Sequence, residues 1–343
     1  MSDIIQAELP IHIDSTMRSA AASCLQKFKN EFILGLRPAR LSIDLHAGAV
    51  FSSTLEHFYR NVHEEKVPPS VARVRAYGHF ARAWGAFESD KDTAKTPDQM
   101  WAAVEDYLNV YPPESDHVQP MQYGGRTAVE FSFAIPLDDP SFPLHPSGSP
   151  FIYVGRADLL GVLTQSGRPV IRDEKTSSRL ASNWSEQWDL RAQFLGYCWA
   201  AQQGGINCDT VVIRGIIINK TMIRQVEAIK MYARWEIDRW YEQLRRDLWR
   251  IRRAWDENYF DYNLGDACTM YSGCPFNILC KSSSPEAWHD TFKVQRWNPL
   301  LRNPIDETSA PFPLSIVASP VSSGSDKGSG LDTVTNPPES MKE

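Results

Sequence analysis

Apolar residues recur at helical spacing along most of the first third of the chain. Residues 15–34 and 46–63 place apolar side chains three and four positions apart, which predicts two helices, the first capped by Ser15. The segments 69–87 and 97–111 continue this pattern, and each begins with a proline, which suits the first turn of a helix. The spacing therefore predicts a mostly helical N-terminal region.

The pattern changes to alternation at residue 128. In AVEFSFAIP, residues 128–136, apolar and polar side chains alternate, which predicts a β-strand. The segment 151–163 and the run that begins at Pro169 are separated by the turn residues QSGR, so these two segments predict a β-hairpin. A helix at about 187–203 follows the hairpin.

Two more strands and a long helix complete the predicted order. TVVIRGIII and TMIRQVEAIKM, within residues 210–231, predict the strands, and residues 231–258 predict the helix. The order is helices, a small sheet, a helix, further strands and a helix. This order is typical of an α/β domain.

Composition and charge set the limits of the interpretation. Residues 1–300 predict a single domain, whereas residues 301–343 are rich in Pro, Ser, Gly, Asp and Thr and predict a disordered tail. A net charge of -6 argues against indiscriminate binding to nucleic acid, so any polyanion site must be local. With six cysteines and no secretion or membrane signal, we expect a reducing, cytoplasmic location.

Three adjacent charges follow the apolar start of the second hairpin strand. The segment IRDEKTSS, residues 171–178, carries an aspartate, a glutamate and a lysine side by side. If the turn is centred between Gln165 and Ser166, antiparallel pairing sets Asp158 opposite Asp173. Two like charges that face each other across a sheet are destabilising, so this pair requires a cation or a proton. A divalent metal ion would meet that requirement.

Lys175 extends this acidic pair. Because side chains alternate along a strand, Lys175 lies on the same face as Asp173, and Glu174 points to the other face. Two carboxylates that hold Mg2+ or Mn2+, with an ammonium beside them, suit hydrolysis of a phosphodiester. Taken alone, a D-x-K tripeptide is more often part of an ordinary solvent-facing hairpin. Further along, Gln193 and Tyr197 lie one helical turn apart, where both would reach a phosphate oxygen or a base edge.

In this order the motifs resemble those of the PD-(D/E)xK nuclease superfamily. Within it they are similar to the RecB-like exonucleases, including phage-encoded members and CRISPR-associated iron-sulfur exonucleases. The resemblance is carried by GRADLL (155–160), by DEKT (173–176) and by the Gln-Tyr pair, and it spans about residues 15–290. It implies a restriction-endonuclease-like core, in which a small mixed β-sheet is flanked by helices. The family would act on DNA in the cytoplasm of a bacterium or a phage-infected host, with a helicase or recombination partner.

The resemblance also implies roles for single residues. Asp158 and Asp173 would be metal ligands, and Lys175 would be the catalytic lysine. Gln193 and Tyr197 would be the pair that positions the substrate. The first motif of the family resembles GAVFSSTLE, residues 48–56, in which Glu56 matches a helical glutamate that contributes to the metal site.

Ser52 departs from the family pattern. Many RecB-like members carry a metal-binding histidine four residues before the glutamate of the first motif, whereas this chain has Ser52 four residues before Glu56. A lost ligand would mean weaker metal binding, another metal preference or an inactive descendant. His46 and His57 lie nearby, but their spacing does not replace that ligand on one helical face.

Four cysteines predict a second, structural site. Cys268, Cys274 and Cys280 lie close together near the end of the domain, and three thiols at this spacing suggest a metal site that lacks one ligand. Cys24, from the first helix, would supply it. The resemblance implies that the four hold a [4Fe-4S] cluster that joins the two ends of the domain. Zinc is the main alternative, and for Cys24 alone a small buried hydrophobe is the simpler interpretation.

The last long helix combines basic and aromatic residues. Residues 234–255 hold seven arginines, and four tryptophans are interleaved with them. Such a helix can follow a phosphate backbone and stack unpaired bases, but it is equally typical of a helix that packs its tryptophans on a core. If it binds DNA, the predicted contacts are Arg245, Arg246, Arg252 and Arg253.

Three functions are compatible with these motifs. The leading hypothesis is a Mg2+- or Mn2+-dependent DNA exonuclease or end-processing nuclease with a structural iron-sulfur cluster. The alternative, motivated by Ser52, is a catalytically inactive nuclease fold that binds DNA or a protein partner. A site-specific restriction-type endonuclease shares the metal chemistry, but it does not account for the Gln-Tyr helix or the cysteines.

Overall fold

The structure, a computed structural model, describes residues 7–38, 42–88, 92–269 and 273–317. Its α-helices are α1 (Ser15–Ser23), α2 (Leu25–Phe28), α3 (Ile43–His63), α4 (Pro69–Trp84), α5 (Pro97–Val110), α6 (Ala192–Gln203), α7 (Arg234–Asp256) and α8 (Asn277–Lys281). Short 3-10 or π-helical turns are η1 (Lys29–Ile33), η2 (Glu186–Trp188), η3 (Asp266–Cys268) and η5 (Pro285–Thr291).

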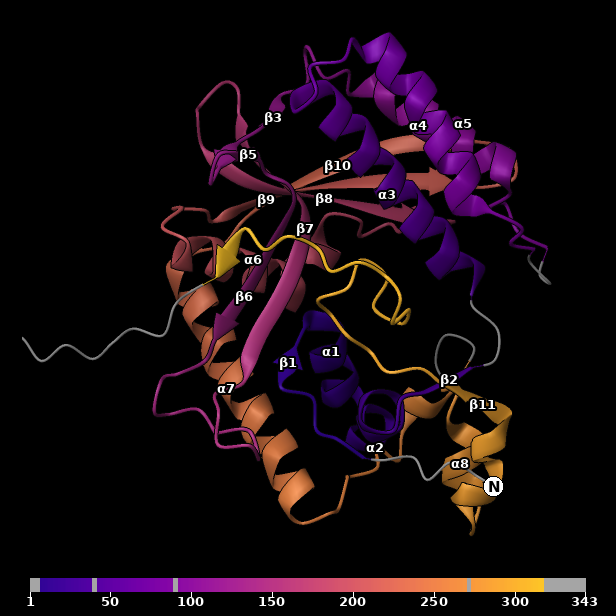
Figure 1. Ribbon diagram of the computed structural model, residues 1–343, viewed down its shortest axis with the longest axis vertical. Helices are drawn as coiled ribbons and strands as arrows, with labels where there is room; N and C mark the ends of the chain where they lie inside the picture. Colours follow the sequence, from indigo (N-terminus) through magenta and orange to yellow (C-terminus); the bar gives the residue numbers. More distant parts are fainter. Residues whose placement is uncertain (1–6, 39–41, 89–91, 270–272, 318–343) are drawn as a thin grey trace, which may run out of the picture.

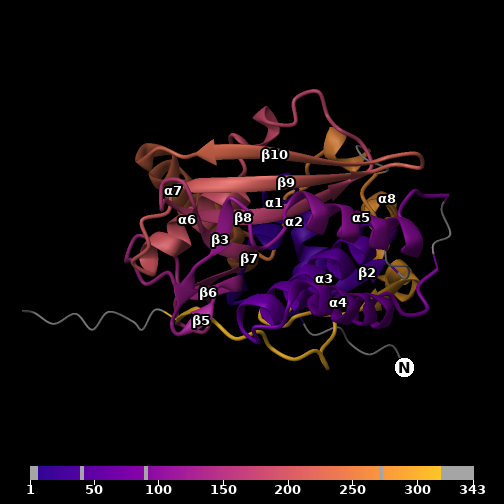
Figure 2. The same ribbon diagram turned by 90° about the horizontal axis from the view of Figure 1, so that it is seen from above.

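The strands form one central mixed sheet and two small ribbons. They are β1 (His12–Ile13), β2 (Leu36–Pro38), β3 (Val118–Pro120), β4 (Gln122–Tyr123), β5 (Arg126–Thr127), β6 (Val129–Pro136), β7 (Ile152–Leu163), β8 (Pro169–Ser177), β9 (Thr210–Ile218), β10 (Ile223–Met231), β11 (Phe292–Val294) and β12 (Ile316–Val317). The central order is β10-β9-β8-β7-β6-β12, with β1 and β3 also paired to β7. Figure 2 shows β10, β9, β8, β7 and β6 stacked in this order.

Helices cover both faces of the sheet (Figure 1). On one face, α3, α4 and α5 bury residues such as Phe51, Phe80 and Tyr107 against Leu159 and Val212. On the other face, α1, α6 and α7 close a second core that contains apolar side chains of β6 to β9. Because each core removes the apolar side chains of one sheet face from water, both helical layers are required. The predicted α/β fold, with a mixed sheet flanked by helices and a helical N-terminal region, is confirmed.

The first predicted helix differs in detail from the structure. Asp14, not Ser15, caps α1, since its carboxylate accepts a hydrogen bond of 2.8 Å from the Met17 amide. The helix then breaks at Cys24, whose backbone is extended with a φ of -167°. The apolar spacing continues through this break, which explains why periodicity alone predicted one helix.

The segment that begins at residue 301 also differs from the predicted tail. Residues 301–317 pack against the sheet: Leu301 bridges Pro311, the Ser315 amide donates to the Ser132 carbonyl, and β12 pairs in parallel with β6. In Figure 1 this segment, in yellow, ends at β12 beside β6. The rest of the predicted tail, residues 318–343, lies outside the described residues. Among the described helices, none is long and apolar enough to cross a membrane.

Candidate active site

The hairpin of β7 and β8 positions the predicted acidic pair. Leu159 pairs with Arg172 and Leu160 with Ile171, so the register is the predicted one, and Asp158 and Asp173 are the next residues beyond the last paired positions. Gly155 lies further along β7, where any side chain would collide with the Phe133 ring, since an added Cβ would be 2.3 Å from it. The glycine thus leaves room for the Phe133 ring of β6 to lie across β7.

The carboxylates of this hairpin are crowded. The Asp158 carboxylate accepts a hydrogen bond of 2.7 Å from the Glu174 amide. Burial raises the pKa of Asp158 well above its ordinary value, and the nearby carboxylates of Asp173, Glu174 and Glu130 raise it further. Burial also raises the pKa of Asp173, against the opposing effect of Lys175. The site therefore holds more acid than its own cations neutralise.

Lys175 lies directly beside Asp173. Its ammonium forms an ion pair with Asp173 Oδ1 and lies 5.7 Å from the centre of the Phe194 ring on α6. Asp173 is 2% exposed, and its Oδ1 has no well-formed hydrogen bond within the described part of the chain. The geometry thus brings Asp158, Asp173 and Lys175 together on the side of the sheet that α6 covers.

The predicted pair on α6 binds to β7. Gln193 Nε2 donates to the Tyr197 hydroxyl at 2.8 Å, and that hydroxyl donates to the Arg156 carbonyl at 2.6 Å. Burial, followed by the nearby Asp173, raises the pKa of Tyr197 well above its usual value, so the phenol stays neutral. The pair joins α6 to β7 two residues before Asp158, and the Tyr197 hydroxyl already has its partners.

Glu130 is a carboxylate in the site that sequence reasoning missed. It lies on β6 with a φ of 54°, which is rare for any residue other than glycine and marks local strain. Because of this twist, Val129 faces the α3 to α5 layer and Phe131 faces the opposite core. Burial raises the pKa of Glu130 to about 7, although Arg156 Nε lies 2.8 Å away. The available signal was that Glu130 is the one acid in the predicted strand AVEFSFAIP.

Glu56, the predicted third acid, projects from α3 into a different environment. It accepts hydrogen bonds from Arg60 Nε at 2.9 Å and from Arg302 Nη1 at 2.7 and 2.8 Å. Burial acts to raise the pKa of Glu56, but Arg302 and Arg60 outweigh it and lower the pKa. Glu56 lies near Glu130, whose pKa it helps to raise. No sequence motif predicted these arginine contacts.

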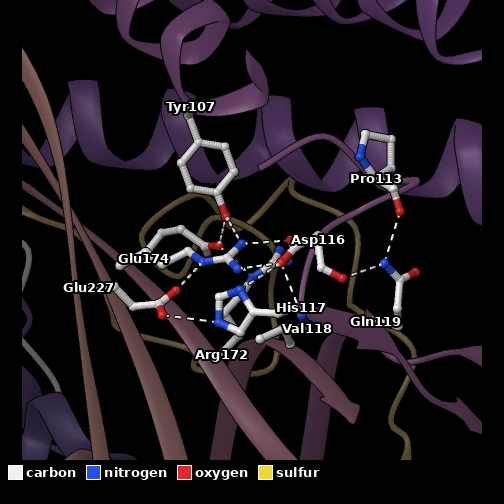
Figure 3. A network of polar contacts seen from close by, with 10 residues as sticks. Tyr107, Pro113, Asp116, His117, Val118, Gln119, Arg172, Glu174 and Glu227 are labelled. Atoms are coloured by element: carbon white, nitrogen blue, oxygen red, sulfur yellow. Dashed lines mark hydrogen bonds and ion pairs between the residues drawn. The ribbon is translucent and has the colours of Figure 1, made fainter. Parts of the chain in front are cut away.

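The other face of β8 carries a buried ionic network (Figure 3). Arg172 Nε lies 2.6 Å from Glu174, and the Tyr107 hydroxyl donates to the same carboxylate. Arg214 binds both oxygens of Asp116, at 2.8 and 2.5 Å. Burial acts to raise the pKa of Glu174, yet Arg172 and its other neighbours outweigh it and lower the pKa. Glu174 therefore belongs to the far face, as alternation predicted.

The oxygen ligands of the site suit a hard divalent cation. The raised pKa values of Asp158 and Asp173, two buried carboxylates that face each other, indicate that a cation would relieve the crowding. Within the described residues, however, no three His, Cys, Asp or Glu side chains are arranged to hold a metal ion. Asp158 and Asp173 thus offer a pair of carboxylates, while Glu56 is bound to arginine.

The four predicted cysteines lie in one region of the molecule. Burial raises the pKa of Cys280, and the thiols of Cys274, Cys24 and Cys268 raise it further. Burial likewise raises the pKa of Cys274, with Cys24 and Cys268 among the contributing neighbours. The Cys24 thiol lies 3.8 Å from the Asp261 carbonyl, so α1 and the C-terminal segment meet here. Residues 270–272, between two of these cysteines, lie outside the described residues.

The predicted DNA contacts on α7 are occupied by neighbouring acids. Arg245 and Arg246 both bind Glu242, at 2.5 and 2.9 Å. Arg252 binds Asp256 at 2.9 Å, and Arg253 binds Glu257 at 2.8 Å. The structure places these four arginines on the outer helix of the second layer, and their ion-pair partners Glu242, Asp256 and Glu257 lie on or directly after the same helix. Their role as DNA contacts stays a prediction.

The chain matches a known protein family over most of its length. A family model described as the PD-(D/E)XK nuclease superfamily matches residues 17–281, which is more than half of the chain. No curated protein matches the chain.

Two solved structures resemble the chain. The crystal structure of a protein called SSO0001 is 13% identical, with a TM-score of 0.24, and the match covers 57% of this chain and 72% of that one. A crystal structure from Eubacterium rectale, titled "Putative exonuclease", is 12% identical, with a TM-score of 0.41 and coverage of 79% and 93%. Both TM-scores lie below 0.5, so assignment to a family rests on the match over residues 17–281.

Proposed function

Because the chain belongs to the PD-(D/E)XK nuclease superfamily, we propose that it is a metal-dependent DNA exonuclease or end-processing nuclease. The superfamily predicted from the motifs is thereby confirmed, whereas the RecB-like branch, the exonuclease type and a helicase or recombination partner belong to the proposal. The exonuclease type is supported only by the motif order from Gly155 to Tyr197. The observation that carries hydrolysis is the crowding of Asp158 and Asp173 beside Lys175.

Each residue of the site has a proposed role. Asp158 and Asp173, with Glu56 as a third carboxylate, would hold Mg2+ or Mn2+, and the bound ion would polarise the phosphate and the attacking water. Lys175 would stabilise the negative charge that builds on the phosphate oxygens. Gln193 and Tyr197 would fix the position of β7 through the Arg156 carbonyl, so that Asp158 keeps its orientation. Of the pair, Gln193 is the better candidate for a DNA contact, since the Tyr197 hydroxyl is occupied.

A nuclease assay with matched variants tests this proposal. With Mg2+ or Mn2+, we expect Asp173→Asn and Lys175→Ala each to lower DNA hydrolysis by about a thousandfold or more, as expected when transition-state charge loses its support. The controls are Asp209→Asn and Lys230→Ala, which remove the same groups from surface ion pairs with Arg168 and Asp189. Near-normal hydrolysis in Asp173→Asn or Lys175→Ala would refute the proposal.

A second candidate function is an inactive nuclease fold that binds DNA or a protein partner. It is favoured by the occupation of Glu56 by Arg302 and by Ser52 in place of the family histidine. Titration calorimetry with Mn2+ distinguishes the two functions. Binding that is lost in Asp158→Asn supports the enzyme, and wild-type protein without such binding supports the inactive fold.

We also propose a structural [4Fe-4S] cluster on Cys24, Cys268, Cys274 and Cys280. Its support is that Cys24, Cys268 and Cys274, which come from both ends of the described domain, lie close enough to Cys280 to raise the pKa of its thiol. Thiolates are the ligands of such clusters, and zinc is the alternative. Anaerobically purified protein should be brown and contain iron, and Cys274→Ser should lose it. Cys198→Ala, in the core, is the control and should retain it. Colourless protein with stoichiometric zinc would replace the cluster by a zinc site.

A further inference from the structure

The segment 298–317, here called the C-terminal strap, forms a closed loop against the sheet. The Asn298 amide donates to the Pro304 carbonyl at 2.8 Å, and the Phe312 amide donates to the Leu300 carbonyl at 3.1 Å. Ser132 Oγ on β6 donates to the Pro313 carbonyl at 2.6 Å. Both ends of the loop are therefore fixed, and the part between them is held in a defined position.

This loop places Arg302 on Glu56. Arg302 Nη1 lies 2.7 and 2.8 Å from the two carboxylate oxygens. The loop is held in place here by Arg156, which donates to the Arg302 carbonyl at 3.4 Å and whose guanidinium lies 5.0 Å from the centre of the Phe312 ring. Arg156 also binds Glu130 at 2.8 Å, so the strap contacts Glu56 directly and is linked to Glu130 through Arg156.

The two partners of this ion pair differ in exposure. The Glu56 side chain is 10% exposed, whereas that of Arg302 is 40% exposed. A carboxylate this buried needs a cation beside it at all times, because its desolvation is costly. The guanidinium, which is close to solvent, would lose much less by exchanging one anion for another. Arg60, on the same helix as Glu56, binds it through Nε and does not depend on the strap.

We propose that Arg302 exchanges partners when the site is loaded: the divalent cation replaces its guanidinium on Glu56, and the guanidinium then binds a backbone phosphate of the DNA. This rests on the proposed function and adds a substrate-positioning residue to it. The exchange conserves ion pairs, since Glu56 remains next to a cation and Arg302 next to an anion. The planar guanidinium matches a phosphate as well as it matches a carboxylate, so one residue can serve both states.

The exchange predicts two effects of opposite sign for Arg302→Ala. Without the Arg302 guanidinium on Glu56, Mn2+ should bind more tightly in the absence of DNA, by about tenfold. The reason is that the state in which Glu56 is free to bind the metal is no longer a minor population. Without the phosphate contact, DNA should bind more weakly in the presence of Ca2+, with the DNA checked to be intact. The salt dependence of DNA binding should fall by about 0.9 in the log-log slope, the value for one phosphate contact.

Two further variants make the test specific. Arg224→Ala removes an equal charge from the exposed face of edge strand β10 and should change neither affinity beyond general electrostatics. In a Glu56→Ala background, Arg302→Ala should no longer tighten Mn2+ binding, since the pair that it breaks is already absent. Calorimetry measures the metal affinities, and fluorescence anisotropy of labelled DNA measures the others.

The four outcomes separate the exchange from simpler roles. Tighter metal binding with weaker DNA binding supports it. Loss of both affinities means that Arg302 only holds the site together, and a gain of both means that the strap only blocks the site; either refutes the exchange. No change in either affinity also refutes it. If wild-type protein binds no Mn2+ at all, the proposed nuclease function fails first, which is a distinguishable result.

Discussion

Both faces of β8 carry acidic and basic side chains, but the acids are paired with buried arginines on one face and crowd against each other on the other. On one face, Arg172 and Glu174 belong to a network in which buried guanidinium groups contact the acids directly. On the other face, Asp173 adjoins Asp158 and forms an ion pair with Lys175. The pKa of Glu174 is lowered by its neighbours, whereas burial and nearby acid raise the pKa of Asp158.

Within the tripeptide DEK, this difference separates Glu174, which belongs to the buried ionic network, from Asp173, which belongs to the candidate active site. A buried charge that is fully paired contributes to a defined packing arrangement, but it has no capacity left to bind a ligand. A buried carboxylate whose protonated form is favoured by its neighbours would gain free energy from an added cation. The DEK sequence alone does not show which of its acids belongs to which class. The alternation of the strand, together with what lies on each face, decides it.

The largest effect on stability is expected at Arg214 in the paired network. Arg214→Ala leaves Asp116 without its two-point contact and removes a partner 3.0 Å from Glu227. Breaking a buried ion pair on one side costs about 3–5 kcal/mol, because the other charge remains buried. Urea unfolding followed by circular dichroism should show this loss.

Arg168→Ala is the matched control for that prediction. It breaks a pair with Asp209 in which both side chains are more than 30% exposed, and surface pairs contribute about 0–1 kcal/mol. If Arg214→Ala were as stable as Arg168→Ala, the buried ionic network would not stabilise the fold more than a surface ion pair does.

Glu130 tests the acidic face through pH. Its pKa is raised to about 7, so the folded state binds a proton that the unfolded state releases near its ordinary pKa. The free energy of unfolding contributed by Glu130 is therefore fully present below about pH 4.5 and is lost as pH rises towards 7. As pH rises, the free energy of unfolding should therefore fall less in Glu130→Gln than in the wild type, by up to about 3 kcal/mol. Urea unfolding at pH 5 and pH 8 measures the difference, and equal declines in both proteins would contradict it.

The sequence predicted the acidic face better than its surroundings. The hairpin register, with Leu159 opposite Arg172, followed from the turn position, and side-chain alternation then assigned Glu174 to the other face. These are local rules, so a single sequence suffices. Arg302 and Glu56 are separated by 246 positions, and only the tertiary fold brings them together. The strap is rich in Pro, Ser, Asp and Thr, as a disordered tail would be, and the few contacts that hold it, such as Arg302 with Glu56 and Phe312 with Arg156, are not encoded in composition.

Asp158 gives a smaller effect with the opposite sign. Asp158→Asn keeps an oxygen that can accept the Glu174 amide, and it removes one of the crowded charges. We expect the free energy of unfolding of the variant to be about 1 kcal/mol higher than that of the wild type at pH 8, while DNA hydrolysis is lost. Such a gain is common when a site is strained for function. At pH 4 the gain should shrink, because the wild-type aspartate, whose pKa is raised, is then protonated. A loss of stability at pH 8 would mean that Asp158 is held by favourable pairing, as on the other face.

The smallest effects are expected on α7, where the arginines face solvent and not the sheet. Arg246 and Arg253 are 68% and 77% exposed, and each forms an ion pair with an acid four residues away that solvent screens. Arg246→Ala with Arg253→Ala should therefore leave the free energy of unfolding nearly unchanged. If these arginines contact DNA, the log-log salt slope of binding should fall by about 1.8, twice the value for one phosphate. An unchanged slope in fluorescence anisotropy would leave α7 as a packing helix and restrict the DNA contacts to other surfaces of the chain.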